Sequence, residues 1–467
     1  MDPGAFSALQ WLALIEHELL LFAGVFFLLG ALDELAMDGI WAWLRLSDRI
    51  PTPVVARDDM RFRQLDGRAA VLVPAWQESG VIAHTIAHAL DAWRQKDLLL
   101  YVGIYRNDPA TLEAAMRGAD GDPRLRLVVL DRDGPTTKAD CLNRLYRAME
   151  DDERRSGVST RMVVLHDAED MVDPAALALL DRAIGDHAFA QLPVLPLPQP
   201  KSRWIGSHYC EEFAESHGKA MVVRSALGTS LPAAGVGCAF SRAALARLAM
   251  RDSDTGPFSV ESLTEDYELG LKVGATGGSS TFLRVRGRDG KLVATRAYFP
   301  DRLEDAVRQK TRWTHGIALQ GWDRLGWGEG LAEFWMRMRD RRGPLAALVL
   351  LSGYLLFALA ALLTVLDLAG FDRPWQPSAL LTVLLAANIA SFAWRAAMRF
   401  AFTRAEYGWR EGLRAVLRIP VANVISIMAG WRALLAYART LRGAPAVWDK
   451  THHAAHPVRN GHMATVR

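Results

Sequence analysis

The segment Met162-Val163-Val164-Leu165-His166-Asp167-Ala168-Glu169-Asp170 places three carboxylates directly after a short apolar run. Similar apolar runs precede it, separated by longer stretches of mixed apolar and charged residues: 69–73, 99–105 and 125–130. This alternation predicts an α/β fold with a largely parallel sheet. Ligands bind such sheets at the carboxyl ends of the strands, so we expect the chemistry to lie where these runs end.

Polar residues follow each predicted strand. Pro74-Ala75-Trp76-Gln77-Glu78 follows the first, and Asn107-Asp108 follows the second. No GxxxxGK[ST] or GxGxxG pattern follows a strand, which argues against P-loop and dinucleotide-binding folds. The carboxylates after Leu165 suit a hard divalent cation bound to a diphosphate. The alternative at this point is a solvated acidic turn that caps the next helix.

Two further motifs lie beyond the predicted sheet strands. Thr264-Glu265-Asp266 is a second acidic cluster, for which the alternative is a helix N-cap. Gln309-Lys310-Thr311-Arg312-Trp313 lies in a predicted helix over 302–320, where the i, i+3 spacing places Gln309 and Arg312 on one face. Arginine pairs with phosphate and an aromatic ring stacks on a sugar, but an exposed charged helix fits the same residues.

The composition limits the functional classes. The chain has 467 residues, of which 51% are hydrophobic, and a formal net charge of +3, which is too even for a nucleic-acid-binding protein. Its three cysteines show no CxxC spacing, so we expect neither a disulfide framework nor a zinc site.

The apolar residues concentrate near the two ends. Residues 345–366 and 376–394 are free of charged residues and long enough to cross a bilayer. Residues 19–32 are also free of charge but short, so a first crossing must extend back through Glu16, and a buried structural helix or a cleaved signal peptide are the alternatives. The apolar run 419–431 is short and flanked by arginines, so we expect it to lie at the membrane interface, like the predicted helix 322–341.

The positive residues predict the orientation. Residues 1–18 contain no Lys or Arg, whereas arginines crowd after the first apolar segment and beyond residue 394. By the positive-inside rule the N-terminus is outside, and the middle of the chain and its tail are cytoplasmic. The predicted divisions are a membrane anchor (1–44), a catalytic domain (45–321), an interfacial helix (322–343), two transmembrane helices (344–400), interfacial helices (401–443) and a cytoplasmic tail (444–467).

Taken together, the motifs resemble those of the processive family-2 glycosyltransferases, membrane enzymes with a Rossmann-like GT-A domain such as cellulose, hyaluronan and chitin synthases. The resemblance covers roughly residues 68–453 and rests on the order of the motifs. Residues 74–78 resemble Pro-Ala-x-Asn-Glu with Gln77 in place of Asn, Lys138 precedes a Leu-Asn pair, Asp167-Ala168-Glu169 resembles Asp-x-Asp, and the last two motifs match Thr-Glu-Asp and Gln-x-x-Arg-Trp.

The resemblance implies an inverting, metal-dependent, processive transfer from a UDP-sugar, with an N-acetylhexosamine favoured, to a growing polysaccharide. This would take place at the bacterial inner membrane and be coupled to export. Asp266 would be the base, and Asp167 and Glu169 would hold Mg²⁺ or Mn²⁺. The implied nucleotide-binding residues are Pro74, Glu78, Asp108, Lys138, Asp167 and Arg312, and the implied acceptor-binding residues are Glu265, Gln309 and Trp313.

The C-terminal motif Trp448-Asp449-Lys450-Thr451-His452 resembles the Trp-x-Lys-Thr element of these enzymes. It implies a gating loop in which Trp448, Lys450 and Thr451 close over the nucleotide. A basic tail that binds anionic lipid is the alternative.

The closer resemblance is to the bacteriophage adsorption protein B type, which usually carries a further domain that binds cyclic-di-GMP. Regulation by that nucleotide would therefore act through a domain or partner that this chain does not contain, and an outer-membrane partner would complete export. Two other functions fit the same motifs. One is a single-transfer enzyme that glycosylates a lipid carrier, and the other is a non-catalytic phage-receptor or export scaffold with the same fold.

Overall fold

The computed structural model describes residues 7–252, 256–370, 378–443 and 457. Its centre is a seven-stranded sheet in the order β4-β3-β2-β5-β8-β6-β9. The strands are β2 (Arg68–Ala75), β3 (Leu98–Tyr105), β4 (Leu125–Leu130), β5 (Thr160–Leu165), β6 (Phe189–Gln191), β8 (Cys238–Ser241) and β9 (Ser280–Phe282). All neighbours are parallel except β8, which is antiparallel to both β5 and β6. The predicted largely parallel sheet is confirmed.

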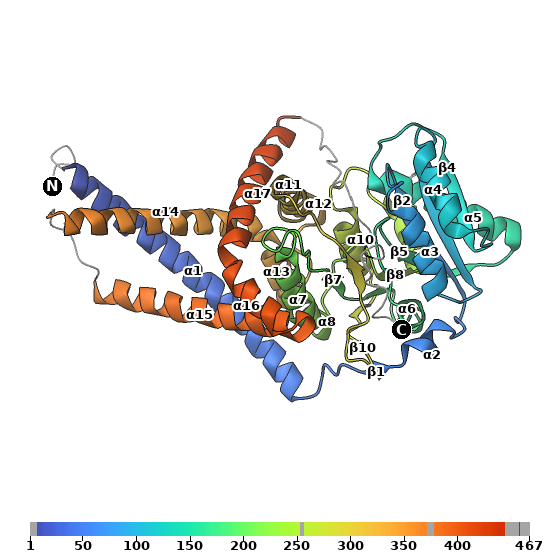
Figure 1. The fold of residues 1–467 in the computed structure, drawn as a ribbon, viewed down its shortest axis with the longest axis horizontal. Helices are drawn as coiled ribbons and strands as arrows, with labels where there is room; N and C mark the ends of the chain where they lie inside the picture. The colour runs from blue at the N-terminus through green and yellow to red at the C-terminus, as the bar shows by residue number, and fades with distance from the viewer. Residues whose placement is uncertain (1–6, 253–255, 371–377, 444–456, 458–467) are drawn as a thin grey trace.

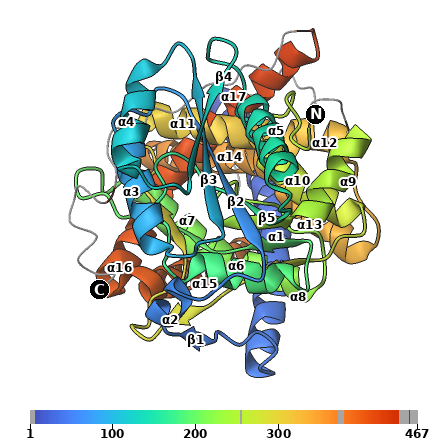
Figure 2. The same cartoon turned by 90° about the vertical axis from the view of Figure 1, so that its right-hand side faces the viewer.

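Helices cover both faces of this sheet (Figure 2). Alternate residues of β2 point to opposite faces, because the side-chain period of a strand is two. Val71 and Val73 pack with α3 (Ile82–Ala92), α4 (Pro109–Ala119) and α6 (Ala176–Ile184). Leu72 packs with the opposite layer, which contains α5 (Lys138–Ser156), α9 (Arg242–Asp252) and α10 (Glu265–Ala275). The strand carries apolar residues on both faces because both are buried.

Smaller elements complete the domain. Two short parallel pairs lie outside the main sheet, formed by β1 (Val54–Val55) with β10 (Arg286–Gly287) and by β7 (Val194–Pro196) with β11 (Thr295–Ala297). The helices α2 (Arg57–Arg61), α7 (His208–Glu215), α8 (Met221–Ala226) and α12 (Gly321–Leu325), and the π-helix η2 (Ser216–Ala220), complete the connections.

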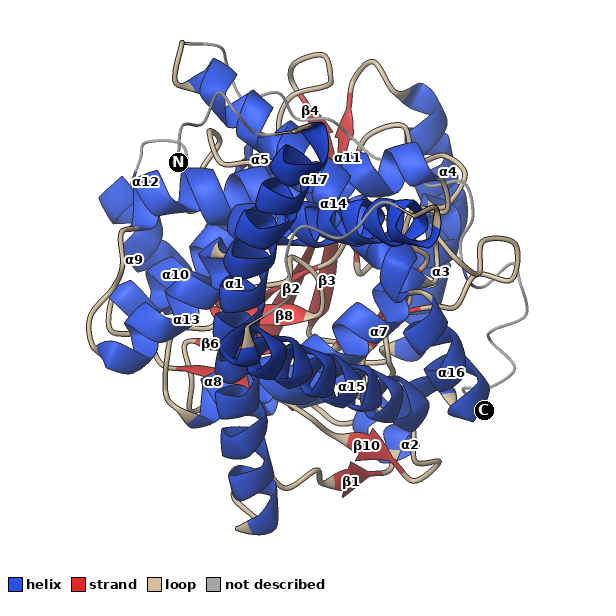
Figure 3. Ribbon diagram, turned by 90° about the vertical axis from the view of Figure 1, so that its left-hand side faces the viewer, coloured by secondary structure: helices blue, strands red, loops and turns tan. Residues whose placement is uncertain are grey.

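Four described helices are long and apolar enough to cross a membrane: α1 (Ala8–Leu46), α14 (Gly343–Leu368), α15 (Ala379–Tyr407) and α17 (Ile419–Thr440). The first three extend together away from the sheet and form a bundle, to which α1 contributes contacts with both others (Figures 1 and 3). The described parts of the predicted spanning segments thus lie in helices, α15 beginning at Ala379, and the first helix is longer than its apolar run.

The boundaries differ from the prediction at three places. Residues 302–320 form α11 (Leu303–Trp313) followed by a π-helix, η3 (Thr314–Gln320). The single helix expected over 322–341 is two, because Gly326, Gly328 and Gly330 adopt positive φ angles between α12 and α13 (Leu331–Arg341). The last apolar helix continues nine residues past Trp431, so its length no longer excludes a crossing, although α17 runs across the bundle in Figure 1.

Candidate active site

The three carboxylates that follow β5 differ in burial and in hydrogen bonding. Asp170 shapes the turn, because its Oδ2 accepts a hydrogen bond from the Asp167 N–H (3.0 Å) and lies 2.7 Å from His166 Nδ1. Asp167 and Glu169 are half-buried instead. Burial, followed by the charges of Asp167 and Glu78, raises the pKa of Glu169 well above its ordinary value. Such mutual repulsion between carboxylates is relieved by a cation.

Lys138 connects this turn to the second acidic motif. It is the first residue of α5, whose N-cap Thr137 accepts a hydrogen bond from the Asp140 N–H. Its Nζ lies 2.6 Å from Asp167 Oδ1 and 3.9 Å from Glu265 Oε1. Burial alone would lower the pKa of Lys138, but the surrounding carboxylates, above all Asp167, raise it above its ordinary value. The lysine is therefore a fixed cation between the two motifs.

Glu265 and Asp266 open α10. Burial, together with the charge of Asp266, raises the pKa of Glu265 to about 7. Asp266 Oδ1 accepts a hydrogen bond from the Tyr267 N–H (2.7 Å), and its Oδ2 faces Gly235. A Cβ on Gly235 would lie 2.1 Å from that oxygen, and its φ of +75° favours glycine. The Gly-rich stretch Gly235-Val236-Gly237 therefore leaves space for the Asp266 carboxylate.

Thr264 precedes α10 without capping it. Its side chain makes no capping hydrogen bond to the described first turn, although Glu265 and Asp266 do occupy that turn, as the N-cap alternative expects. Instead Thr264 packs against the π-helix η3, where a Cβ on Gly316 would lie 2.5 Å from its Oγ1. This close approach joins the start of α10 to the π-helix that directly follows the Gln-x-x-Arg-Trp motif.

Hydrogen bonds connect the segments that follow β2 and β3. Asp108 Oδ2 accepts from the Gln77 N–H (2.6 Å) and its Oδ1 accepts from the Thr111 N–H (3.3 Å). The Glu78 N–H donates to Thr111 Oγ1 (3.0 Å), and Pro74 lies within β2. Asp108 is thus occupied by backbone amides and shapes this edge.

Trp76 and Tyr105 form an aromatic pair at the same edge, which the sequence motifs do not predict. The rings of Trp76 and Tyr105 meet edge to face at 5.1 Å, and Gly134 packs against both. Asn107 holds Gly134 through two hydrogen bonds, of 2.8 and 3.0 Å. An aromatic residue at the carboxyl end of each of two neighbouring strands was the signal in the sequence.

The residues of the Gln-x-x-Arg-Trp motif lie in two different environments. Gln309 Oε1 and Arg312 Nε are buried, and neither has a hydrogen-bond partner among the described residues. The Arg312 charge also acts on Glu265. Trp313 instead joins an aromatic cluster, with its ring centroid 6.0 Å from that of Tyr209 and 6.4 Å from that of Phe299. The alternative of an exposed charged helix is therefore wrong.

The donor set fits a hard divalent cation that is shared with a phosphate ligand. No group of three or more metal-ligating side chains occurs in the described part of the chain. Asp167 and Glu169 offer two oxygen ligands, which suffice for Mg²⁺ or Mn²⁺ when a diphosphate and water supply the others. The predicted gating residues Trp448, Lys450 and Thr451 lie outside the described residues.

Sequence comparison identifies the family. Residues 67–316 match the model described as glycosyltransferase like family 2. Bacteriophage adsorption protein B of Escherichia coli strain K12 and bacteriophage N4 adsorption protein B of Escherichia coli O157:H7 are each 33% identical to this chain over 470 residues. The alignment covers 95% of this chain and 62% of the relatives, so the chain spans less than two thirds of their length.

Structural comparison supports the same fold. Mannosyltransferase PcManGT from Pyrobaculum calidifontis, solved in complex with GDP-Man and Mn²⁺, is similar with a TM-score of 0.52 at 18% identity. The similarity covers 91% of this chain and 99% of the mannosyltransferase. The chain belongs to glycosyltransferase family 2 and has the GT-A fold, as its motifs predict.

Proposed function

We propose that this glycosyltransferase catalyses an inverting, processive transfer of a sugar from a UDP-sugar to a growing polysaccharide at the inner membrane, coupled to export. The observation that carries the proposal is the cluster in which Lys138 bridges Asp167, from the strand end, to Glu265, beside Asp266. This cluster would bring the carboxylate of the diphosphate-binding edge close to the acceptor-binding Glu265 and the base Asp266, as transfer from a nucleotide-sugar requires.

Asp266 is the proposed base. Inversion requires a group on the side of the sugar opposite the leaving diphosphate, to take the proton of the acceptor hydroxyl. The space beside Gly235 leaves Asp266 Oδ2 against backbone rather than against a bulky side chain. Glu265 would be partly protonated near neutral pH, so it would bind the acceptor by a hydrogen bond without competing for the same proton.

The leaving diphosphate needs positive charge. Lys138 provides a fixed cation, and Arg312, whose Nε has no partner among the described side chains, provides a second. Asp167 and Glu169 would hold Mg²⁺ or Mn²⁺, which neutralises the diphosphate when bound. Asp108 and Glu78 keep the nucleotide-binding edge in shape through their backbone hydrogen bonds.

The neighbouring helices support coupling to the membrane. The helix α11, which carries Gln309 and Trp313, packs on α17, and α17 packs on α14. An acceptor held beside Trp313 would therefore lie next to the helix bundle. We place the catalytic domain in the cytoplasm, the N-terminus in the periplasm and α17 along the interface, with the segment around Trp448 closing over the nucleotide.

The direct test uses membranes that contain the full chain. They are incubated with a panel of UDP-sugars and Mg²⁺ or Mn²⁺, and the product is sized. A long polymer supports processive transfer, whereas a single sugar on a lipid indicates the lipid-carrier alternative. No transfer from any donor in the panel would favour the scaffold alternative.

Asp266→Asn tests the base. The amide keeps the shape but accepts no proton, so we expect transfer to fall below a few per cent of wild type while UDP affinity is nearly unchanged. Asp58→Asn, an exposed aspartate in the first turn of α2, is the matched control and should retain full activity. Substantial turnover by Asp266→Asn would refute the assignment.

A further inference from the structure

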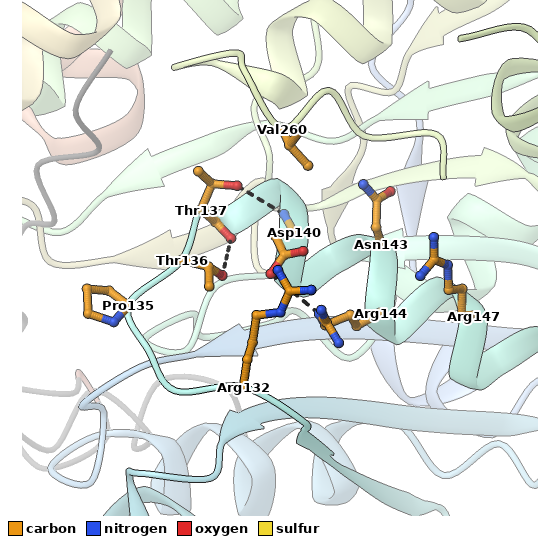
Figure 4. Close-up of a pocket in the computed structure, with 9 residues that line it drawn as sticks. All are labelled: Arg132, Pro135, Thr136, Thr137, Asp140, Asn143, Arg144, Arg147 and Val260. Carbon is orange, nitrogen blue, oxygen red and sulfur yellow. Dashed lines mark hydrogen bonds and ion pairs between the residues drawn. The ribbon is translucent and has the colours of Figure 1, made fainter. Parts of the chain in front are cut away.

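A pocket of about 660 Å³ lies on the outer flank of α5, next to the loop that leads to α10 (Figure 4). Three guanidinium groups and one carboxylate line it. The lining residues are Arg132, Pro135, Thr136, Thr137, Asp140, Asn143, Arg144, Arg147 and Val260. Its chemistry is therefore that of an anion site.

Most of the pocket lies across α5 from the carboxylates of the candidate active site. An α-helix turns by about 100° per residue, so Asp140 and Arg147 lie roughly half a turn around α5 from Lys138. Lys138 reaches Asp167 on the sheet side, where Leu142 and Leu145 are buried in the core. The helix α5 thus stands between the pocket and Asp167, while Thr136, whose Oγ1 lies 2.7 Å from the Tyr105 hydroxyl, joins the rim of the pocket to the Trp76–Tyr105 pair.

Arg132 adds positive charge to the pocket beyond that of the paired Arg144. Arg144 is held by Asp131 and by Asp140, whose Oδ2 lies 3.4 Å from its Nε. Arg132 is exposed and makes no hydrogen bond or ion pair with the described residues, and Figure 4 shows it reaching toward Asp140 and Arg144. Arg147, also exposed, adds a third guanidinium. Three guanidinium groups around a single lining carboxylate suit an anion with several phosphate oxygens.

We propose that this pocket binds an organic phosphate of nucleotide size and that its occupancy biases the acidic motif of α10. The arginines would bind the phosphate, and Pro135 and Val260 would contact an apolar ring. The volume exceeds what a single inorganic phosphate fills. The predicted effect on transfer rests on the proposed function, whereas binding does not.

The coupling would run through the loop that holds Val260. Asn143 Nδ2 donates to the Phe258 carbonyl (2.8 Å), and its Oδ1 accepts from the Phe258 N–H (3.0 Å), which fixes the loop to α5. Ser259 Oγ donates to Glu268 Oε1 in α10 (2.9 Å). The same loop continues to Thr264, so a ligand against Val260 acts on the segment that ends at Asp266.

The test measures binding by the full chain in detergent with EDTA and no sugar donor, using AMP and inorganic phosphate as probes. Arg132→Ala/Arg147→Ala removes two exposed guanidiniums of the pocket. Arg154→Ala/Arg155→Ala removes two exposed guanidiniums near the end of the same helix and is the matched control. We expect the pocket variant to bind AMP at least tenfold more weakly than wild type and the control variant.

Hydrogen exchange gives the second measurement. AMP should slow exchange over residues 256–263 in wild type and in the control, but not in the pocket variant. Equal AMP affinity in all three chains would overturn the site, AMP binding no tighter than phosphate would overturn the ligand size, and unchanged loop exchange would overturn the coupling. Because no donor is present, loss of sugar transfer would not bear on these outcomes.

Discussion

At the scale of single residues, Glu265 links pH to stability. Its pKa of about 7, against an ordinary 4.5, means that the folded chain binds more protons than the unfolded chain between these values. Stability must therefore fall as pH rises through this window, by about 3 kcal/mol at 1.36 kcal/mol per pKa unit. We expect Glu265→Gln to remove this loss, so that its Tm exceeds that of wild type by more at pH 8 than at pH 5.

Thermal unfolding in detergent at the two pH values measures the effect. The matched control is Glu304→Gln, an exposed glutamate in the first turn of α11, which should show no pH-dependent gap. An equal Tm difference at both pH values would show that Glu265 ionises normally.

Asp167 gives the metal prediction. If Asp167 and Glu169 hold the cation that binds the diphosphate, EDTA should abolish transfer, and Mg²⁺ or Mn²⁺ should restore it. Asp167→Ala should weaken UDP binding in the presence of metal and remove the difference in UDP affinity with and without EDTA. Titration of UDP under both conditions checks this, and full transfer in excess EDTA would contradict it.

At the scale of elements, we expect the contact between η3 and the start of α10 to position Asp266, the proposed base. A Cβ on Gly316 would lie 2.5 Å from Thr264 Oγ1, so Gly316→Ala must displace one of the two segments. We expect kcat to fall at least tenfold, about 1.4 kcal/mol in the barrier, while UDP affinity is kept. Gly343→Ala is the control, because its Cβ would lie an ordinary 3.6 Å from Thr314. Unchanged kcat in Gly316→Ala would mean that the contact does not position Asp266.

The sequence predicted the individual helices and strands better than the contacts between them. Apolar runs followed by polar residues located β2, β3, β4 and β5 and the turn at Asp167, because buried parallel strands end in this way. The contact between Lys138 and Glu265 could not be predicted in the same way. Between these two residues the chain forms β8, a four-residue antiparallel strand that gives no periodic signal in the sequence. The π-helix after Trp313 was not predictable either, since apolar spacing does not distinguish it from an α-helix.

At the scale of the whole molecule, buried ion pairs hold the catalytic domain on the bundle. Lys219 of η2 lies 2.5 Å from Asp38 Oδ1 and 3.3 Å from Glu34 Oε2, both in α1, and 2.8 Å from Glu215 Oε1. Lys219→Met would leave these carboxylates short of a cation, at a cost of about 3 kcal/mol. We expect a lower Tm in detergent than for Lys291→Met, an exposed control, and equal values would contradict the role of this network.

The orientation of the molecule follows from how α17 is placed. If α1, α14 and α15 cross the membrane and α17 lies along its surface, the two ends of the chain are on opposite sides. A cysteine at Asp2 should then react with an impermeant thiol reagent in intact cells, and one at His462 should not. The three native cysteines are buried and should contribute little background. Asp58→Cys, exposed on the catalytic domain, should react only after lysis, which controls for accessibility. Labelling at His462 in intact cells would mean that α17 crosses the membrane, as its 22 residues allow.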